Sequence, residues 1–392
     1  MRELSRWESV RLGDVCEVVS GTTPSTGDPH LWDGNIKWIT PAELQDDSYF
    51  ISDTQRYISS GAKLKPMPAG TVLLSSRAPI GKVAIAGVEM CCNQGFKNLV
   101  CSDAIHNQYL YRFLKGKTAY LNDLGRGATF KEISKPIVED VCIPLPPLST
   151  QRAIAATLDQ AAALIAMRRR QIEKLELLVQ ARFVELFGDP VRNERAWEVK
   201  RLGMICDVRD GTHDSPEYVF SGYPLITSKN VSAGHIDFTG VNQIAKADFD
   251  LINRRSKVDR GDIIMPMIGT IGNPVIVETE REFAIKNVAL IKFNSGEIIN
   301  TYLISLLRLD YFSYVTSRSN RGGTQKFIAL SDIRGLPIPL PPLPLQQAFA
   351  QFVSQAESQK QTLKQAQAKL QMQYDALMQE YFGQGDKTHD YR

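Results

Sequence analysis

A proline-rich segment followed by a long helical pattern occurs twice in this chain of 392 residues, and this repeat restricts the possible folds more than any other feature. The segments 143–148 and 338–343 both read Ile-Pro-Leu-Pro-Pro-Leu and are followed by Gln151 and Gln346. Proline fixes φ and disfavours helix in the preceding residue, so each segment is expected to be an extended brace that leads into a helix. The runs of about 36 residues beyond the two glutamines contain no proline or glycine. The sequence therefore predicts two long helices, each preceded by a proline brace.

Apolar residues recur along both helical runs with the seven-residue spacing that is typical of a left-handed coiled coil. A run of about 36 residues would extend roughly 54 Å, which is more than one small domain can cover. We therefore expect the two helices to pack on each other, antiparallel because a globular region separates them; two separate helices, each lying on its own domain, are the alternative. The residues expected at this seam or on a partner surface are Leu158, Ile165, Arg168, Ile172, Leu175, Val179, Arg182, Leu186, Phe349, Phe352, Leu363, Leu370 and Leu377.

The globular regions before the two braces also share a scaffold. Trp7-Glu8 and Arg11-Leu12-Gly13 in the first region recur 190 residues later as Trp197-Glu198 and Arg201-Leu202-Gly203. Between such anchors the two halves hardly resemble each other. We interpret this pattern as a duplicated scaffold whose variable parts have diverged, as loops do when they change over a shared framework.

Each globular region is expected to be a compact α+β domain. Short apolar runs such as 36–39 and 288–291 are bounded by glycine, proline, asparagine and aspartate and predict strands, and helical segments are expected near 108–114 and 301–309. The expected organisation is a first domain at 1–142, a first brace and helix at 143–188, a second domain at 189–337, a second brace and helix at 338–383, and a polar, disordered tail at 384–392.

Composition and motifs exclude several classes of function. The formal net charge is only +3, so any nucleic-acid surface must be local or shared with a partner. The six cysteines form no C-x-x-C pair and the five histidines are scattered, so reduced thiols are expected and a zinc site is not. We find no P-loop, no methyltransferase motif and no nucleophile elbow. No apolar run approaches the length of a signal segment or a membrane span, which predicts a soluble, cytoplasmic protein.

The loops carry binding chemistry instead. Arginine, lysine, asparagine and glutamine can pair with the edges of guanine and adenine, and serine, threonine and lysine can hold phosphates. A solvated surface with turn glycines would account for any one such residue, but comparable sets recur on the loops of both halves. The candidates in the first domain are Thr22, Thr23, Ser25, Arg77, Lys82, Asn93, Gln94, Lys97, Arg126 and Lys131. The candidates in the second domain are Arg209, Thr212, His213, Lys229, Asn230, Thr270, Asn273, Lys286, Asn287, Arg318, Arg321, Gln325 and Lys326.

Several of these features together resemble the DNA-specificity subunit of type I restriction–modification enzymes. They are the Ile-Pro-Leu-Pro-Pro-Leu-x-x-Gln brace, the long helix ending in Phe-Gly, the Trp…Leu-Gly domain openings, and the Asp-Gly-Thr-His-x-x-Pro run at 210–216. The resemblance covers essentially the whole chain. It implies two target-recognition domains in a pseudo-twofold arrangement, each reading one half of a split, asymmetric DNA sequence, with an antiparallel coiled coil between them as spacer.

The resemblance also implies partners. The helices would dock two methyltransferase subunits, which in turn recruit restriction and translocation subunits. Adenine methylation and DNA cleavage would reside in those partners, so this chain would contain no catalytic residue and no cofactor. S-adenosylmethionine is then expected in the methyltransferase subunits, and ATP and magnesium in the restriction subunits.

Two points stay open at the level of sequence. Arg168 and Arg182 interrupt the apolar seam, and they either contact the methyltransferase subunits or DNA, or reach out from the edge of the seam to water. The rival functions are a coiled-coil assembly adaptor whose globular domains bind protein, and a solitary nuclease or methyltransferase of unknown motif.

Overall fold

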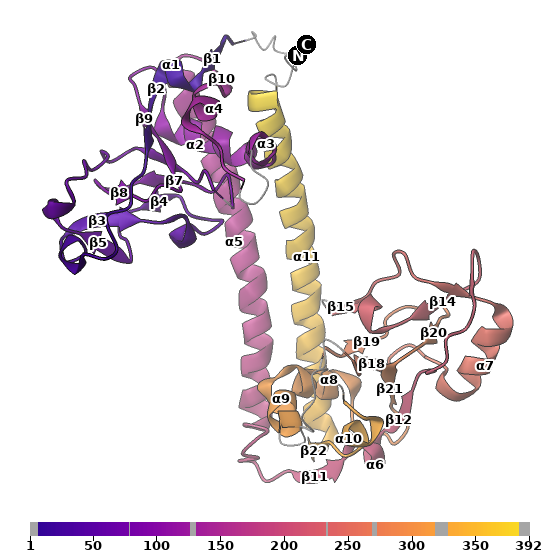
Figure 1. Ribbon diagram of the computed structural model, residues 1–392. Helices are drawn as coiled ribbons and strands as arrows, with labels where there is room; N and C mark the ends of the chain where they lie inside the picture. Colours follow the sequence, from indigo (N-terminus) through magenta and orange to yellow (C-terminus); the bar gives the residue numbers. More distant parts are fainter. Residues whose placement is uncertain are drawn as a thin grey trace. The chain divides into compact units, whose positions relative to one another are not determined.

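The structure is a computed structural model that describes residues 7–77, 79–125, 131–232, 234–268, 273–317 and 328–383. The chain divides into two units, one made of 1–169 with 365–392 and the other of 170–364. Each unit contains one α+β domain, as predicted, and one end of each of the two longest helices, which are α5 (Leu148–Phe187) and α11 (Leu343–Phe382) (Figure 1). The tail expected at 384–392 lies outside the described residues.

The first domain contains two mixed sheets. Its strands are β1 (Ser9–Arg11), β2 (Cys16–Ser20), β3 (Ile36–Ile39), β4 (Phe50–Ile51), β5 (Arg56–Ile58), β6 (Val72–Leu74), β7 (Val83–Ala86), β8 (Cys91–Cys92), β9 (Lys97–Cys101) and β10 (Cys142–Pro144). Its helices are α1 (Leu12–Val15), α2 (Asn107–Gly116), α3 (Thr118–Leu124) and α4 (Lys135–Glu139), with short 3₁₀ turns η1 (Pro29–Leu31), η2 (Pro41–Glu43) and η3 (Ser60–Ala62). The strand orders are β2-β9-β6-β7-β4 and β5-β3-β8. In Figure 1, β3 and β5 lie at the end of this domain that is remote from α5.

The second domain also contains two larger sheets, one fully antiparallel and one mixed. Its strands are β11 (Glu198–Arg201), β12 (Asp207–Asp210), β13 (Tyr218–Val219), β14 (Tyr223–Ile226), β15 (Val231–Ser232), β16 (His235–Ile236), β17 (Gln243–Ile244), β18 (Ile263–Pro266), β19 (Val275–Ile276), β20 (Ala284–Ile285), β21 (Val288–Lys292) and β22 (Pro337–Leu340). Its helices are α6 (Leu202–Ile205), α7 (Lys246–Ser256), α8 (Asn300–Arg308), α9 (Asp310–Ser317) and α10 (Leu330–Arg334), with the 3₁₀ turn η4 (Ser228–Asn230). The two larger sheets have the strand orders β12-β21-β18-β19 and β13-β17-β14-β20.

The domain openings and the braces, which the sequence repeats, pair with each other. In the first unit β1 runs antiparallel to β10, and in the second β11 runs antiparallel to β22. The leucines that follow, Leu12 and Leu202, are fully buried. A Cβ on Gly13 would lie only 2.9 Å from the Cβ of Glu139 in α4, so glycine is needed for this close approach. The repeated openings therefore close each domain at its brace.

Each brace is fixed by its glutamine, and both glutamines are fully buried. The Gln151 amide donates to the carbonyls of Ala104 and Pro146, 3.0 and 2.8 Å away, and its oxygen accepts from the backbone N–H of His106 at 2.8 Å. Gln346 makes the same three kinds of contact with Glu297, Pro341 and Ile299. Each side chain thereby satisfies backbone groups that the prolines and the start of α2 or α8 would leave unpaired.

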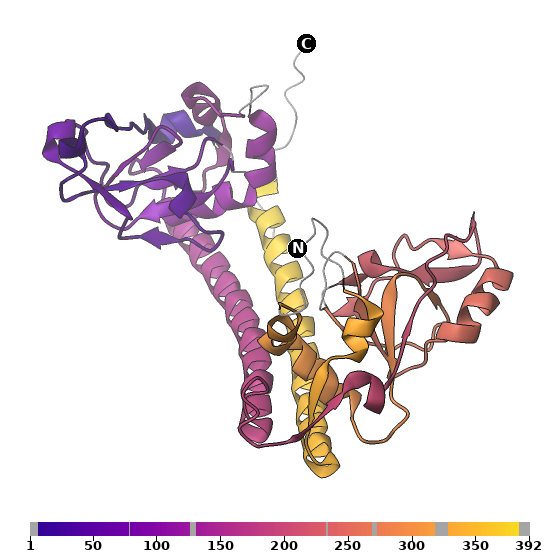
Figure 2. The ribbon, with the colours of Figure 1, turned by 60° about the horizontal axis from the view of Figure 1, so that its bottom comes forward.

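Within each unit, α5 and α11 lie side by side, and the views in Figure 1 and Figure 2 agree on this. In the first unit the start of α5, including Ile154 and Leu158, shares a core with Phe382 at the end of α11. In the second unit Phe183, near the end of α5, packs on Phe349 near the start of α11, with ring centroids 5.5 Å apart. Opposite ends of the two helices meet in both units, which confirms the antiparallel pairing; the alternative of two separate helices is wrong.

Candidate nucleic-acid interface

The candidate loops of the first domain meet at the ends of β2 and β8, in what we term the first junction (residues 21–25 and 92–97). The N–H of Thr22 donates to the Cys92 carbonyl at 2.8 Å, and the Thr23 hydroxyl bonds to the side-chain oxygen of Gln94. A Cβ on Gly21 would lie 1.8 Å from the Asn93 carbonyl, so only glycine lets the two loops approach this closely. Thr22 and Gln94 are exposed.

The second domain has an equivalent junction (residues 210–215 and 285–288). The N–H of Thr212 donates to the Ile285 carbonyl at 2.9 Å, and Gly211 approaches that carbonyl so closely that a Cβ would lie 2.4 Å from it. The Nδ1 of His213 lies 2.9 Å from the side-chain oxygen of Asn287. His213 and Asn287 thus occupy the places of Thr23 and Gln94, on the same backbone scaffold.

The imidazole of His213 is held between two side-chain oxygens. Its Nε2 lies 2.8 Å from a carboxylate oxygen of Asp210, whose other oxygen accepts from Arg255 at 3.0 Å. Hydrogen bonds with Asn287 and then with Asp210 raise the pKa of His213 above its usual range. The charged imidazolium, which can donate from both nitrogens, is therefore favoured at this exposed position.

Several other candidates of the second domain serve local structure. Arg209 pairs with Asp207 and with a backbone carbonyl, and the side-chain oxygen of Asn230 caps its own turn by accepting from Thr227. The Lys286 ammonium donates to Ser215 within the second junction. Lys229 and Asn273 are exposed.

Three of the basic candidates of the first domain, Arg77, Lys82 and Lys97, are engaged within the protein. Lys97 is buried, with 7 % of its surface exposed, and lies 3.2 Å from Glu132, which Arg77 also contacts at 3.0 Å. Partial burial alone would raise the pKa of Glu132, but the hydrogen bonds from Lys97 and Arg77 outweigh it and lower that pKa. Lys82 donates to the Leu44 carbonyl at 2.6 Å. Lys131 is exposed.

Ser25 contributes its backbone rather than its side chain to the described contacts, because its carbonyl accepts from the indole of Trp32 at 3.0 Å. Six further candidates lie outside the described residues, so the structure does not place them: Arg126, Thr270, Arg318, Arg321, Gln325 and Lys326.

Sequence reasoning missed three side chains around the first junction and one exposed aromatic residue of the second domain. Trp32 and Trp38 hold the 22–25 loop, since the Trp38 indole donates to the Thr22 carbonyl at 3.1 Å, and Arg56 lies over the Trp32 ring. Phe220 is fully exposed at the turn between β13 and β14. Tryptophans are rare in this chain, with four in 392 residues, and this is the signal that could have drawn attention to the first pair.

The candidates on the long helices are all buried or half-buried. In the second unit Arg182 donates to Glu185 at 2.8 Å and its guanidinium lies 5.9 Å from the ring centroid of Phe352. This is the geometry of a long side chain at the edge of a seam. It supports the interpretation that Arg182 packs along the seam and reaches out from its edge to water. The sequence pattern underestimated the aromatic residues, because Phe183, Phe187 and Phe382 are among the most buried side chains of the helices.

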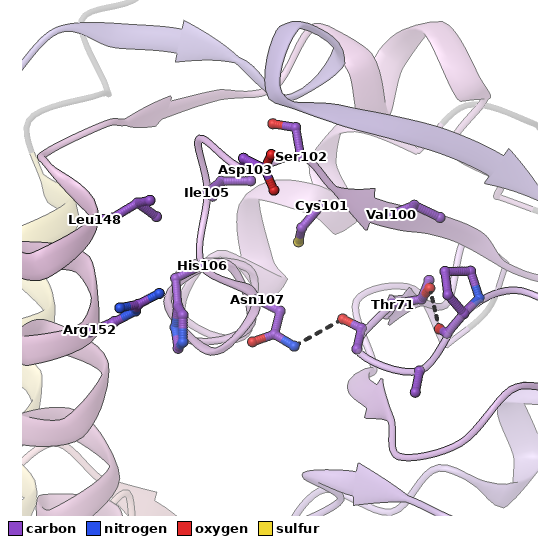
Figure 3. Close-up of a pocket in the computed structure, with 13 residues that line it drawn as sticks. Thr71, Val100, Cys101, Ser102, Asp103, Ile105, His106, Asn107, Leu148 and Arg152 are labelled. Carbon is purple, nitrogen blue, oxygen red and sulfur yellow. Dashed lines mark hydrogen bonds between the residues drawn. The ribbon is translucent and has the colours of Figure 1, made fainter.

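A pocket of about 540 Å³ lies elsewhere in the first unit and shares no residue with the first junction. Figure 3 shows Arg152 of α5 and His106 at the start of α2 on one side of it, with Asn107 donating to the Gly70 carbonyl. Burial first, and then the charge of Arg152, lower the pKa of His106, which favours the neutral imidazole. The pocket belongs to the brace region.

No cluster of three or more potential metal ligands is present among the residues that the structure describes. The helices in this part of the chain also include none with the length and apolarity needed to cross a membrane.

Comparison with known proteins gives a consistent result. The family model described as type I restriction modification DNA specificity domain matches residues 5–177 and 194–372. The type I restriction enzyme MjaIX specificity subunit of Methanocaldococcus jannaschii is 33% identical over 387 residues, covering 88% of this chain and 86% of that protein. The EcoBI specificity subunit of Escherichia coli is 23% identical and covers 65% of this chain and 60% of its own length.

Solved structures show the same fold. The S subunit of a type I restriction–modification system from M. genitalium has a TM-score of 0.62 at 16% identity, covering 97% of both chains. A chain from a structure of type I R-M complex assembly and conformational transition has a TM-score of 0.61 at 19% identity, covering 96% of this chain and 98% of that one.

Proposed function

Because this chain belongs to the type I restriction–modification DNA-specificity family, we propose that it is the non-catalytic, sequence-specific DNA-recognition subunit of such a complex. The observation that carries the proposal is the pair of equivalent junctions. Each is built on a glycine that lets two loops meet, and each presents polar side chains that can donate to and accept from base edges.

The two junctions present different chemistry, and this supports the reading of an asymmetric site. Thr23 and Gln94 are neutral in the first domain, whereas His213, Asp210 and Arg255 form a charged group in the second. A shared scaffold with unlike side chains can bind the same kind of ligand but prefer different sequences, because base contacts set specificity. Each domain would read one half of a divided target.

The long helices would set the spacer between the half-sites and dock two methyltransferase subunits. Apolar side chains remain exposed on α5, among them Met167 at 53 % in the first unit and Leu177 at 62 % in the second. Contiguous exposed apolar surface can mark a partner-binding site, so these side chains are candidates for the methyltransferase contact. Restriction subunits would join through the methyltransferases. The S-adenosylmethionine would lie in the methyltransferase subunits, and the ATP and magnesium in the restriction subunits, all acting on DNA in the cytoplasm.

The proposal is tested by footprinting the full chain together with its methyltransferase on DNA, and by sequencing the methylation pattern of cells that contain the complex. We expect protection and methylation at one divided sequence. An assembly adaptor would give no sequence-dependent protection. The purified chain alone, incubated with DNA and S-adenosylmethionine or magnesium, should neither methylate nor cleave; activity there would favour a solitary enzyme.

A further inference from the structure

The smaller sheet of the first domain carries an arginine stacked on tryptophan at its surface. Arg56 in β5 lies directly opposite Trp38 in β3 in the antiparallel register. Its guanidinium carbon is 3.8 Å from the ring centroid of Trp32 and 5.3 Å from that of Trp38. Residues opposite each other on neighbouring strands share one face of the sheet, so Arg56 and Trp38 lie on the same face. Arg56 is exposed above a half-buried Trp32 and a buried Trp38.

The two indoles beneath the arginine are rigid. Trp32 and Trp38 meet edge to face with their centroids 4.8 Å apart, and Trp38 is almost fully buried, with Ile58 in the same small core. Thr54 donates to the Arg56 carbonyl at 2.8 Å and so fixes the backbone where β5 begins. A guanidinium that lies over such a support loses little further freedom when its N–H groups bind a ligand.

The donors of Arg56 are unused within the described part of the chain. Its guanidinium has no hydrogen bond or ion pair there, and Asp53, the acidic residue before the strand, is occupied by Lys37 and Tyr57, each at 2.6 Å. Lys37 and Tyr57 project to the opposite face of the same strand pair, since they alternate with Trp38 and Arg56. An exposed arginine that is stacked but unpaired is pre-organised for an external acceptor.

The stack is also continuous with the first junction. The indole of Trp38 donates to the carbonyl of Thr22 and that of Trp32 to the carbonyl of Ser25, so the two rings that support Arg56 also hold the 22–25 loop. The free edge of Arg56 therefore belongs to the surface at which the first domain would meet DNA.

We propose that Arg56 is a specificity-determining residue of the first domain, which reads a guanine edge through two parallel hydrogen bonds from its guanidinium. The inference rests on the proposed DNA-recognition function. Guanine presents two acceptors, O6 and N7, in the major groove, and a planar guanidinium is the donor pair that matches them. A guanidinium fork can also bind a phosphate through two hydrogen bonds. The place of Arg56 beside the polar side chains of the first junction favours the base-reading role, and the test below separates the two contacts.

The test uses the full chain with its methyltransferase and a pool of DNA duplexes with randomised positions, from which bound molecules are recovered and sequenced. The variants are Arg56→Lys, which keeps the charge but removes the fork, and Arg56→Ala. Arg11→Ala is the matched control, because Arg11 is an exposed arginine of the same unit that is paired with Asp140 away from the stack. Melting temperatures of all variants are measured in parallel.

Both Arg56 variants should lose the preference for guanine at one position of one half-site, with roughly 5- to 140-fold weaker binding to the original sequence. Binding to unrelated duplex should be unchanged, and so should the sequence preference at the other half-site. The melting temperature of each variant should equal that of the parent. If Arg56→Lys binds as the parent does, or if both variants weaken all sequences equally, Arg56 does not read a base and the inference is overturned. If the parent complex selects no sequence, the proposed function fails and this inference falls with it.

Discussion

At the scale of single residues, the buried glutamines of the braces are the clearest case of one side chain deciding local structure. Gln151→Ala would leave two carbonyls and one N–H unpaired in a buried site, as would Gln346→Ala. Each loss of a buried partner costs about 1–3 kcal/mol. We expect each variant to lower the urea midpoint for unfolding of its own unit. Gln160→Ala, at an exposed position on α5, is the control and should leave the midpoint unchanged.

The second residue-scale prediction concerns pH. Hydrogen bonds with Asn287 and Asp210 raise the pKa of His213, although partial burial and then the charge of Arg255 oppose the shift. A raised pKa means that the contribution of the charged imidazole is fully present below its unfolded pKa of about 6.5 and is lost as the pH rises through the folded value. Sequence-specific binding by the second domain should weaken over that range.

A His213→Gln variant should show a flatter pH profile in the same binding assay, since its side chain does not titrate. His235→Gln, at an exposed histidine outside the second junction, should keep the parent profile. A parent profile that is already flat would contradict the role of the imidazolium.

At the scale of elements, the two units differ in how α2 or α8 is attached to α5 or α11. In the first unit Arg112 of α2 is buried and lies 2.6 Å from Asp159 of α5, which also accepts from Tyr49 at 2.6 Å. Serines stand at the equivalent positions of the second unit, Ser305 and Ser354. Removing one member of a buried pair costs more than removing both, because the remaining charge is left without a partner.

Asp159→Ala should therefore destabilise the first unit by about 3 kcal/mol, and the double variant Arg112→Met with Asp159→Leu should recover much of the loss. Thermal unfolding followed by calorimetry would show the shift in one transition only. Equal shifts for the single and the double variant would mean that lost packing, and not an unpaired charge, explains the effect.

The elements also show how far the sequence alone leads. The strands at 36–39 and 288–291, the helices near 108–114 and 301–309, and the two long helices could be predicted, because periodicity and proline placement are local signals. The partners of the loop side chains could not. Glu132 pairs with Lys97, which is 35 residues away in sequence, and no local sequence pattern predicts this ion pair. The Trp32–Arg56 stack was missed for the same reason, since it depends on strand register.

At the scale of the whole molecule, the small net charge of +3 limits how strongly the chain alone can hold DNA. Phosphate neutralisation by lysine and arginine supplies most of the affinity of nucleic-acid binding proteins and makes it depend on salt. We expect weak binding by the isolated chain and much tighter binding, with a steeper salt dependence, once the methyltransferase is added. Titration of duplex DNA at several salt concentrations would measure both; tight specific binding by the chain alone would contradict the prediction.

The helices lead to a prediction about the target itself. If their length sets the spacer, insertion of four residues, about one turn, into both α5 and α11 adds roughly 6 Å. This corresponds to about one to two base pairs at 3.4 Å each. The methylated sequence should keep both half-sites and gain a longer spacer. The same insertion into α11 alone is the control, since it breaks the pairing of the helices; an unchanged spacer in the double insertion would refute the idea.

The antiparallel pairing of β1 with β10, and of β11 with β22, has an evolutionary consequence. The chain enters and leaves each domain at neighbouring points, so a replacement domain that keeps the backbone contacts of Gln151 or Gln346 would leave the start of the flanking helix in place. Recombination between related genes could then exchange one domain for another in a single event. New combinations of half-sites would arise from existing parts.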